Sequence, residues 1–127
     1  MRTIRFILIC LVVVGCSQPL FPDKELQTTW DGILSAMRDG RVDDVRRFAT
    51  DRGFAALADP NFTRREDLKT VFRRWGTEWP RDRWRLMAIS PTYALTARGE
   101  NGKYGAVGGN YEFIRTNDVW RLNNWLH

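Results

Sequence analysis

The most regular hydrophobic pattern lies in the last third of the chain, between Trp84 and Leu126. Apolar side chains recur there at alternate positions in four runs, with polar or charged side chains between them. A period of two is typical of strands that have one buried and one wetter face. Turn-forming residues separate the runs at Ser90-Pro91, at 99–102 and at 116–118. The pattern therefore predicts a four-strand antiparallel meander with one apolar face to cover.

The alternation also predicts which strand residues lie under that cover. The expected inner face consists of Trp84, Leu86, Ala88, Tyr93, Leu95, Ala97, Val107, Tyr111, Phe113, Trp120 and Leu122. Thr92, Thr96 and Glu112 fall on the opposite face. The third strand is expected over Lys103–Arg115. Its glycines at 105, 108 and 109 permit bulges, so we expect a bent rather than a flat sheet.

Two helices are expected at the start of the folded domain. Apolar residues from Leu26 to Met37 recur at helical spacing within Lys24–Arg38. Asp39-Gly40 ends that helix, because glycine adopts the left-handed exit conformation without a steric penalty. A shorter helix follows over Val42–Ala49, and the tight break between the two predicts an antiparallel pair.

A third helix is expected just before the sheet. Thr63-Arg64-Arg65-Glu66 has the sequence of a capping box, which opens helices. Its apolar face would carry Leu68, Val71, Phe72 and Trp75, and Gly76 would close it. Upstream, the apolar run Phe54–Ala58 is short enough for either a strand or a helical turn, and we expect a turn or a short edge strand.

The first fifteen residues have the pattern of a targeting signal. Arg2 and Arg5 precede an unbroken apolar run, Phe6–Val14, whose nine residues are far fewer than the roughly 20 needed to span a bilayer. The run ends in Val13-Val14-Gly15-Cys16, which resembles the lipobox of bacterial lipoproteins. The resemblance implies cleavage after Gly15 and lipidation of Cys16. An ordinary secretory signal and an uncleaved amino-terminal anchor are the alternatives.

This resemblance divides the chain into three parts. Residues 1–15 would be a lipoprotein signal peptide, 16–23 the lipidated cysteine with a short proline-containing tether, and 24–127 the domain. A diacylglyceryl group on Cys16 would anchor the domain to a membrane on the periplasmic side of the cell envelope, since several acyl chains hold stably. Ser17, in place of an aspartate, favours the outer membrane over the inner one.

Composition narrows the set of partners and cofactors. Without residues 1–15 the chain has 18 basic and 15 acidic residues, a balance that does not indicate a nucleic-acid partner. Cys10 would leave with the signal, so Cys16 has no partner for a disulfide. The single histidine is His127, the last residue. One histidine and one lipidated cysteine build neither a metal site nor a Ser-His-Asp set, so we expect no metal and no cofactor.

The order of elements is similar to that of the NTF2-like superfamily. The residues that carry this resemblance are Trp30–Gly40, the alternating Tyr93–Ala97 and the closing Asn117–Leu122. It implies an α+β cone, with three N-terminal helices packed on a curved four-strand antiparallel sheet. A cystatin-like sheet with one long helix is the rival fold. Family members of this kind bind small apolar ligands, dock protein partners or dimerise through the sheet, and we expect one of the non-catalytic roles here.

The same resemblance implies an enzymatic alternative, a small isomerase or dehydratase of the SnoaL or ketosteroid isomerase kind. Without histidine, its acid or base would be a cavity carboxylate, and Asp31 and Glu112 are the candidates. Strict alternation points Glu112 away from the aromatic face. We therefore expect a surface position for it.

Aromatic residues are the candidates for a cavity lining. The set consists of Trp30, Trp75, Trp84, Tyr93, Tyr111, Phe113 and Trp120, all predicted on apolar faces. They are either core or ligand contacts. Trp79 and Trp125 fall outside the pattern and are expected at the surface, where they would hint at a partner.

The third helix and its flanks are basic. Eight basic and four acidic residues lie between Arg64 and Arg85. They form either a solvated helix face or a contact with an anionic surface such as phospholipid. The residues expected to make such a contact are Arg64, Arg65, Lys69, Arg73 and Arg74.

Overall fold

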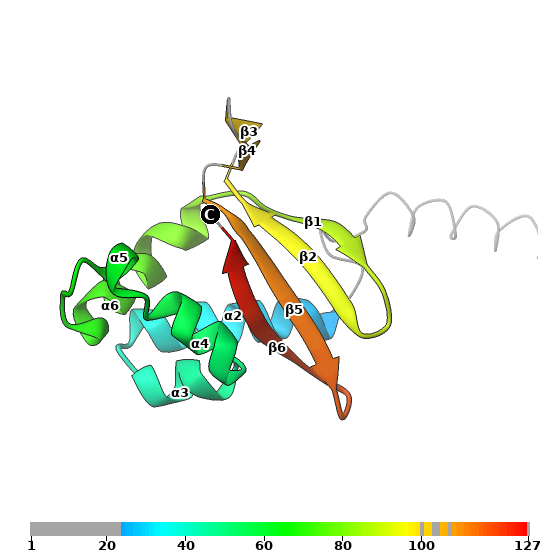
Figure 1. Cartoon of the computed structure of the whole chain (residues 1–127), viewed down its shortest axis with the longest axis horizontal. Helices are drawn as coiled ribbons and strands as arrows, with labels where there is room; N and C mark the ends of the chain where they lie inside the picture. The colour runs from blue at the N-terminus through cyan, green and yellow to red at the C-terminus, as the bar shows by residue number, and fades with distance from the viewer. Residues whose placement is uncertain (1–23, 100, 103–104, 107, 127) are drawn as a thin grey trace, which may run out of the picture.

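Helices and strands form two layers in the computed structural model of the chain (Figure 1). The structure describes residues 24–99, 101–102, 105–106 and 108–126. The expected signal peptide, Cys16 with its tether, Val107 and His127 lie outside the described residues. The helical segments are α2 (Lys24–Arg38), α3 (Val42–Arg47), α4 (Asp51–Leu57), α5 (Pro60–Thr63), α6 (Leu68–Glu78) and the 3₁₀ turn η1 (Trp79–Arg81).

The predicted antiparallel meander is confirmed. Strands β1 (Trp84–Ile89), β2 (Tyr93–Arg98), β5 (Asn110–Thr116) and β6 (Val119–Leu126) lie side by side in that order. Between β2 and β5 the chain forms a separate pair of two-residue strands, β3 (Asn101–Gly102) and β4 (Gly105–Ala106). The expected third strand was therefore too long, and only its second half joins the main sheet. Asn117 and Asp118 turn β5 into β6 with positive φ angles, as a two-residue hairpin requires.

The predicted face of β1 is wrong after a bulge, and the predicted phase of β2, which has no bulge, is wrong for Tyr93 and Thr96. Leu86 pairs with Thr96 but Ala88 pairs with Leu95, so Met87 is an extra residue. In β2, Ala94 and Thr96 are buried against the helices. Tyr93 is 37% exposed and pairs with Ile114 on the outer face, and Ala88 is also exposed. Thr96 tolerates burial because its hydroxyl donates to the Tyr111 carbonyl at 3.2 Å.

α2 has the predicted bounds, and Gly40 ends it at φ +69°. α3 also forms where expected, although it ends two residues early. The predicted turn or edge strand at Phe54–Ala58 is instead part of α4. Thr50 caps that helix by accepting from the Gly53 amide at 3.0 Å. The fold therefore has more helical segments than the three expected.

The predicted capping box is wrong. Thr63 is the last residue of α5, and its carbonyl accepts from the Glu66 amide at 3.0 Å. Arg64 and Arg65 follow with φ angles of 53° and 59°, which are not helical. α6 begins only at Leu68 after Asp67. Gly76 does not end α6 either, since the helix continues to Glu78 and Gly76 faces the backbone of Arg38 in α2.

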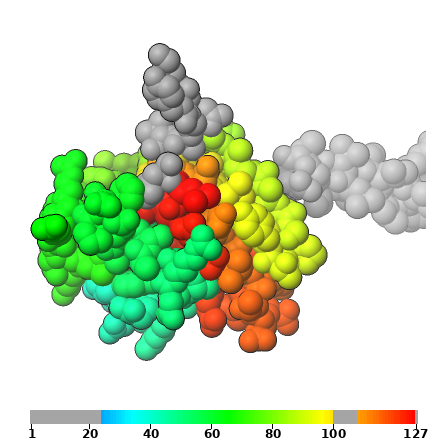
Figure 2. All heavy atoms as spheres, viewed as in Figure 1, coloured from blue at the N-terminus to red at the C-terminus, as the bar shows by residue number. Residues whose placement is uncertain are grey.

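The helices cover one face of the sheet, and the other face is open. α4 and α2 both pack on β6. The chain at 48–50 also bonds to the edge of β6, where the Leu122 amide donates to the Phe48 carbonyl and the Thr50 amide donates to the Leu122 carbonyl. In the space-filling view β2 and β5 face the viewer with no helix over them (Figure 2). The observed class is thus α+β with an open four-strand antiparallel sheet.

Candidate functional site

The expected cavity between helices and sheet is occupied by aromatic side chains. Trp30 of α2 lies at the centre, with its ring centroid 4.5 Å from that of Trp84 and 6.0 Å from that of Trp79, both stacked. Tyr111 meets the same indole edge-on at 5.0 Å. Trp75, Phe113 and Trp120 are buried in the same cluster, each no more than 8% exposed. Of the proposed lining residues, Tyr93 alone lies outside this cluster, on the outer face of the sheet.

Trp79 and Trp125 belong to the same cluster, so the prediction that they are exposed is wrong. They are 4% and 8% exposed, and their centroids lie 5.3 Å apart. A bulge in β6 explains the position of Trp125. Phe113 pairs with Leu122 and Glu112 pairs with Asn124, so Asn123 is an extra residue. The alternation changes there, and Trp125 therefore points inward. Trp79 sits in the 3₁₀ turn, where neither a helical nor a strand period applies.

A polar network that the sequence did not indicate closes one end of the aromatic cluster. The Arg98 guanidinium lies 4.4 Å from the Trp79 ring centroid and is paired with the Asp82 carboxylate. Its Nε donates to the Tyr111 hydroxyl at 2.8 Å. The Tyr111 hydroxyl, the Arg98 Nη2 and the Trp125 Nε1 all donate to the carbonyl of Gly108, at 3.2, 3.3 and 3.2 Å.

This network is suited to holding the fold rather than to acid–base chemistry. Burial raises the pKa of Tyr111 far above its ordinary value of 10.0, and the nearby Arg98 only partly opposes this. The phenol therefore stays protonated at neutral pH. Because each of its groups already has a protein partner, the network stabilises one arrangement of β2, β5 and the 3₁₀ turn.

Neither candidate carboxylate points into the aromatic cluster. Asp31 is exposed on α2 and accepts from Gln27 Nε2 at 2.9 Å. Glu112 is half-buried on the outer face of the sheet, as alternation predicts, and accepts from the Tyr93 hydroxyl at 3.1 Å. Desolvation, and then that hydrogen bond, raise the pKa of Tyr93. Among the described residues no group of three or more His, Cys, Asp or Glu side chains could hold a metal ion.

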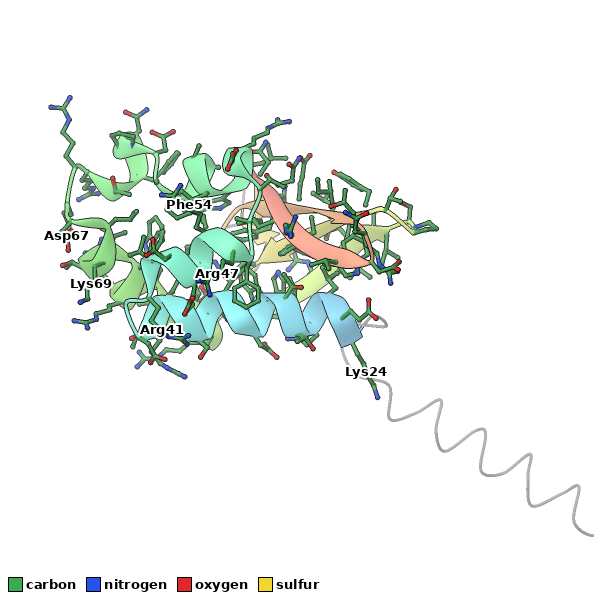
Figure 3. The ribbon with its side chains drawn as sticks, turned by 90° about the horizontal axis from the view of Figure 1, so that it is seen from below. Lys24, Arg41, Arg47, Phe54, Asp67 and Lys69 are labelled. Carbon is green, nitrogen blue, oxygen red and sulfur yellow. The ribbon has the colours of Figure 1, made fainter. Side chains whose placement is uncertain are left out.

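The five basic residues predicted to contact an anionic surface are all exposed. Arg74 pairs with Glu66 at 3.0 Å. Lys69 and Arg73 lie over the end of α2, since a Cβ added at Gly40 would lie 2.7 Å from Arg73 Nε and 3.0 Å from Lys69 Cε. Cations are favourable beside helix C-termini, which gives these two side chains a structural role. Lys69 lies at the opposite end of the molecule from Lys24, where the described chain begins (Figure 3).

Two hollows lie on the surface of the described chain. One, of about 250 Å³, is mostly apolar and is found where the start of α2 meets the β5–β6 turn. The other, of about 460 Å³, is polar and lies at the corner between α2 and α3. Arg41, in that corner, pairs with Asp44 at 2.7 Å and with Asp39 at 3.2 Å, so its charge is already compensated.

No protein-family model, curated protein or solved structure matches this chain. The structure itself shows an α+β class with an open four-strand antiparallel sheet, and the NTF2-like cone is not confirmed. In the described part of the chain, every helix is too short or too polar to cross a membrane.

Proposed function

We propose that this protein is a lipid-anchored, non-catalytic component of a bacterial cell envelope whose domain docks a partner on its surface. Val13-Val14-Gly15-Cys16, after a short apolar run with a basic start, supports the anchor. Ser17 supports placement in the outer membrane, facing the periplasm. The order of helices and strands supports an NTF2-like domain, with α4 and α5 as departures from the expected three helices.

The aromatic cluster is the observation that favours a surface role over a ligand-binding cavity. Its rings stack on Trp30 or meet it edge-on at centroid distances of 4.5–6.3 Å, and they are nearly inaccessible to solvent. Protein interiors packed in this way leave no room for a ligand of useful size unless several rings move together. The positions of Asp31 and Glu112 likewise give the isomerase or dehydratase alternative no acid inside the domain.

Metabolic labelling with an alkyne analogue of palmitate tests the anchor in cells. We expect the wild-type chain to be labelled and recovered with membranes, and Cys16→Ser to lose the label. Cys10→Ser is the matched control, because Cys10 would be removed with the signal. An unlabelled wild-type chain would refute the anchor.

Tryptophan fluorescence of the purified protein tests the surface role. We expect titration with fatty acids and phospholipids below their aggregation concentration to leave the emission of the buried indoles unchanged. A saturable blue shift or quenching would show that the aromatic cluster opens to a ligand, and the cavity role would then replace the surface role.

A further inference from the structure

The tip of the β1–β2 hairpin is an uncharged, exposed segment. Every residue from Met87 to Tyr93 is exposed, and Met87, Ile89 and Tyr93 are 53%, 44% and 37% exposed. No charged side chain occurs between Arg85 and Arg98. Isolated exposed apolar residues are ordinary on protein surfaces, whereas several on one hairpin indicate a binding surface.

This hairpin lies beside the point where the tether enters the domain. The Arg115 amide donates to the Thr92 carbonyl at 2.9 Å, and the Arg115 side chain pairs with Glu25 at 2.9 Å. Arg115 therefore contacts both Thr92 in the hairpin and Glu25 in the first turn of α2. The ribbon shows the same arrangement, with the blue start of α2 and the β1–β2 turn at one end of the molecule (Figure 1).

A lipid anchor at Cys16 would bring this end to the bilayer. The eight residue-to-residue steps from Cys16 to Lys24 span at most about 29 Å. The basic residues near Gly40 lie at the other end of α2, about 21 Å further away along the helix axis. Turning that basic end to the membrane would require an almost fully extended tether running back along α2. With a relaxed tether the end of the molecule that carries both the hairpin and the β5–β6 turn faces the lipid, and the hairpin is the uncharged part of that end.

The chemistry of the hairpin fits the interfacial region of a membrane. At about 3.3 Å per strand residue, Arg85 lies about 13 Å from Ile89, so the tip could enter the 5–10 Å interfacial layer without burying Arg85. Tyr93 has an apolar ring and a polar hydroxyl, the combination preferred at that depth. Strand pairing with a second copy is less favoured, because the bulge at Met87 interrupts the free edge of β1.

We propose that the Met87–Tyr93 tip inserts into the interface of the membrane that carries the Cys16 anchor, which fixes the orientation of the domain. This inference rests on the proposed lipid anchor. It implies that the sheet lies roughly perpendicular to the membrane plane. The basic end of the molecule, near Gly40, then points away from the membrane, toward other envelope components.

Fluorescent labelling of the mature, lipidated chain tests the insertion. Thr92→Cys places a dye on the tip, and Asp43→Cys places the same dye on exposed α3 at the far end of α2. Both chains are reconstituted into phosphatidylethanolamine and phosphatidylglycerol vesicles that contain lipids with a quencher near the headgroup. We expect quenching at residue 92, equal at low and high salt, and none at residue 43.

A second pair of substitutions measures the apolar contribution. Ile89→Ser in the Thr92-labelled chain should lower the inserted-to-free ratio about fivefold, because about half of that side chain remains to be buried. Leu126→Ser is the matched control, since Leu126 is 40% exposed at the other end of the sheet. It should leave quenching unchanged.

Other results would overturn the proposal in distinguishable ways. If the chain floats with vesicles and dye 92 behaves like dye 43, the anchor stands and the insertion is refuted. If the chain does not float, the anchor fails and the insertion fails with it. Quenching of the dye at residue 92 that decreases as the number of protein molecules per vesicle rises, together with cross-links between Thr92→Cys chains, would show that a second copy covers the hairpin instead. Quenching abolished by high salt would identify charged rather than apolar contact.

Discussion

Replacing Gly76 by alanine should destabilise the protein, although alanine is the better helix former. Gly76 lies inside α6 against the end of α2, and an added Cβ would lie 2.3 Å from the Arg38 amide nitrogen and 2.7 Å from its Cα. Both are backbone atoms and cannot rotate away. Because ordinary contacts begin near 3.4 Å, α2 and α6 would have to separate by about 1 Å.

The expected net loss in the free energy of unfolding is about 2 kcal/mol. Overpacking against rigid atoms costs about 3 kcal/mol at the upper end of its range, and the gain in helix propensity from glycine to alanine offsets about 1 kcal/mol. The separation should also disturb the stack of Trp30 on Trp79, which joins α2 to the 3₁₀ turn after α6. A change in near-ultraviolet circular dichroism should therefore accompany the loss.

Urea denaturation of wild type, Gly76→Ala and Gly76→Asn measures these free energies, with Thr77→Ala as the control on the adjacent exposed position. The control should change stability by about 0.5 kcal/mol or less. The asparagine variant distinguishes a glycine required by backbone conformation from a glycine required by close packing. At a left-handed helix end asparagine is tolerated better than alanine, whereas in a tight helix contact the larger side chain is worse. Gly76→Ala as stable as wild type, or Gly76→Asn more stable than Gly76→Ala, would refute the packing argument.

The polar network around Arg98 supports two further predictions. Arg98→Lys should lower the free energy of unfolding by about 2 kcal/mol, because lysine keeps the charge but lacks the planar fork that serves Asp82, Tyr111 and the Gly108 carbonyl together; stability equal to wild type in urea denaturation would contradict this. The raised pKa of Tyr111 predicts that stability falls above about pH 10, since the unfolded chain then loses a phenolic proton that the folded chain retains, with a slope of about 1.4 kcal/mol per pH unit. In Tyr111→Phe the free energy of unfolding should fall less steeply with pH above about pH 10, by the amount that one proton contributes to the slope. A slope equal to that of the wild type would show that the phenol ionises in the folded protein.

Local sequence patterns predicted elements well where a single period applied throughout. α2 is confirmed to the residue, since its apolar stripe is long and its exit carries Asp39-Gly40. Tyr111, Phe113, Trp120 and Leu122 are confirmed on the inner face. The capping-box prediction failed because Thr63 already ended another helix, whose own start at Asp59-Pro60 was not recognised in the sequence.

Two of the other errors, the predicted inward position of Ala88 and the predicted exposure of Trp125, share one cause, a one-residue change of strand phase. The bulge at Met87 turns Ala88 outward, and the bulge at Asn123 turns Trp125 inward. The inner face of β2 was assigned in the wrong phase for another reason, since β2 contains no bulge and its more apolar side chains Tyr93 and Leu95 lie on the outer face. A side-chain period of two means that one extra residue reverses every later assignment in that strand. Neither bulge is marked by a glycine or proline, so the pattern within these two strands did not reveal it.

By itself, the sequence predicted α2, α3, the four strands of the main sheet and with them the α+β class, because these depend on local periods. Only the tertiary structure decided that Trp79 and Trp125 join Trp30 in a filled interior, that Arg98 closes it, and that the uncharged hairpin stands beside the start of α2. Those features depend on contacts between residues far apart in the chain. Burial and proximity arise only when the layers pack, and no period along the chain encodes them.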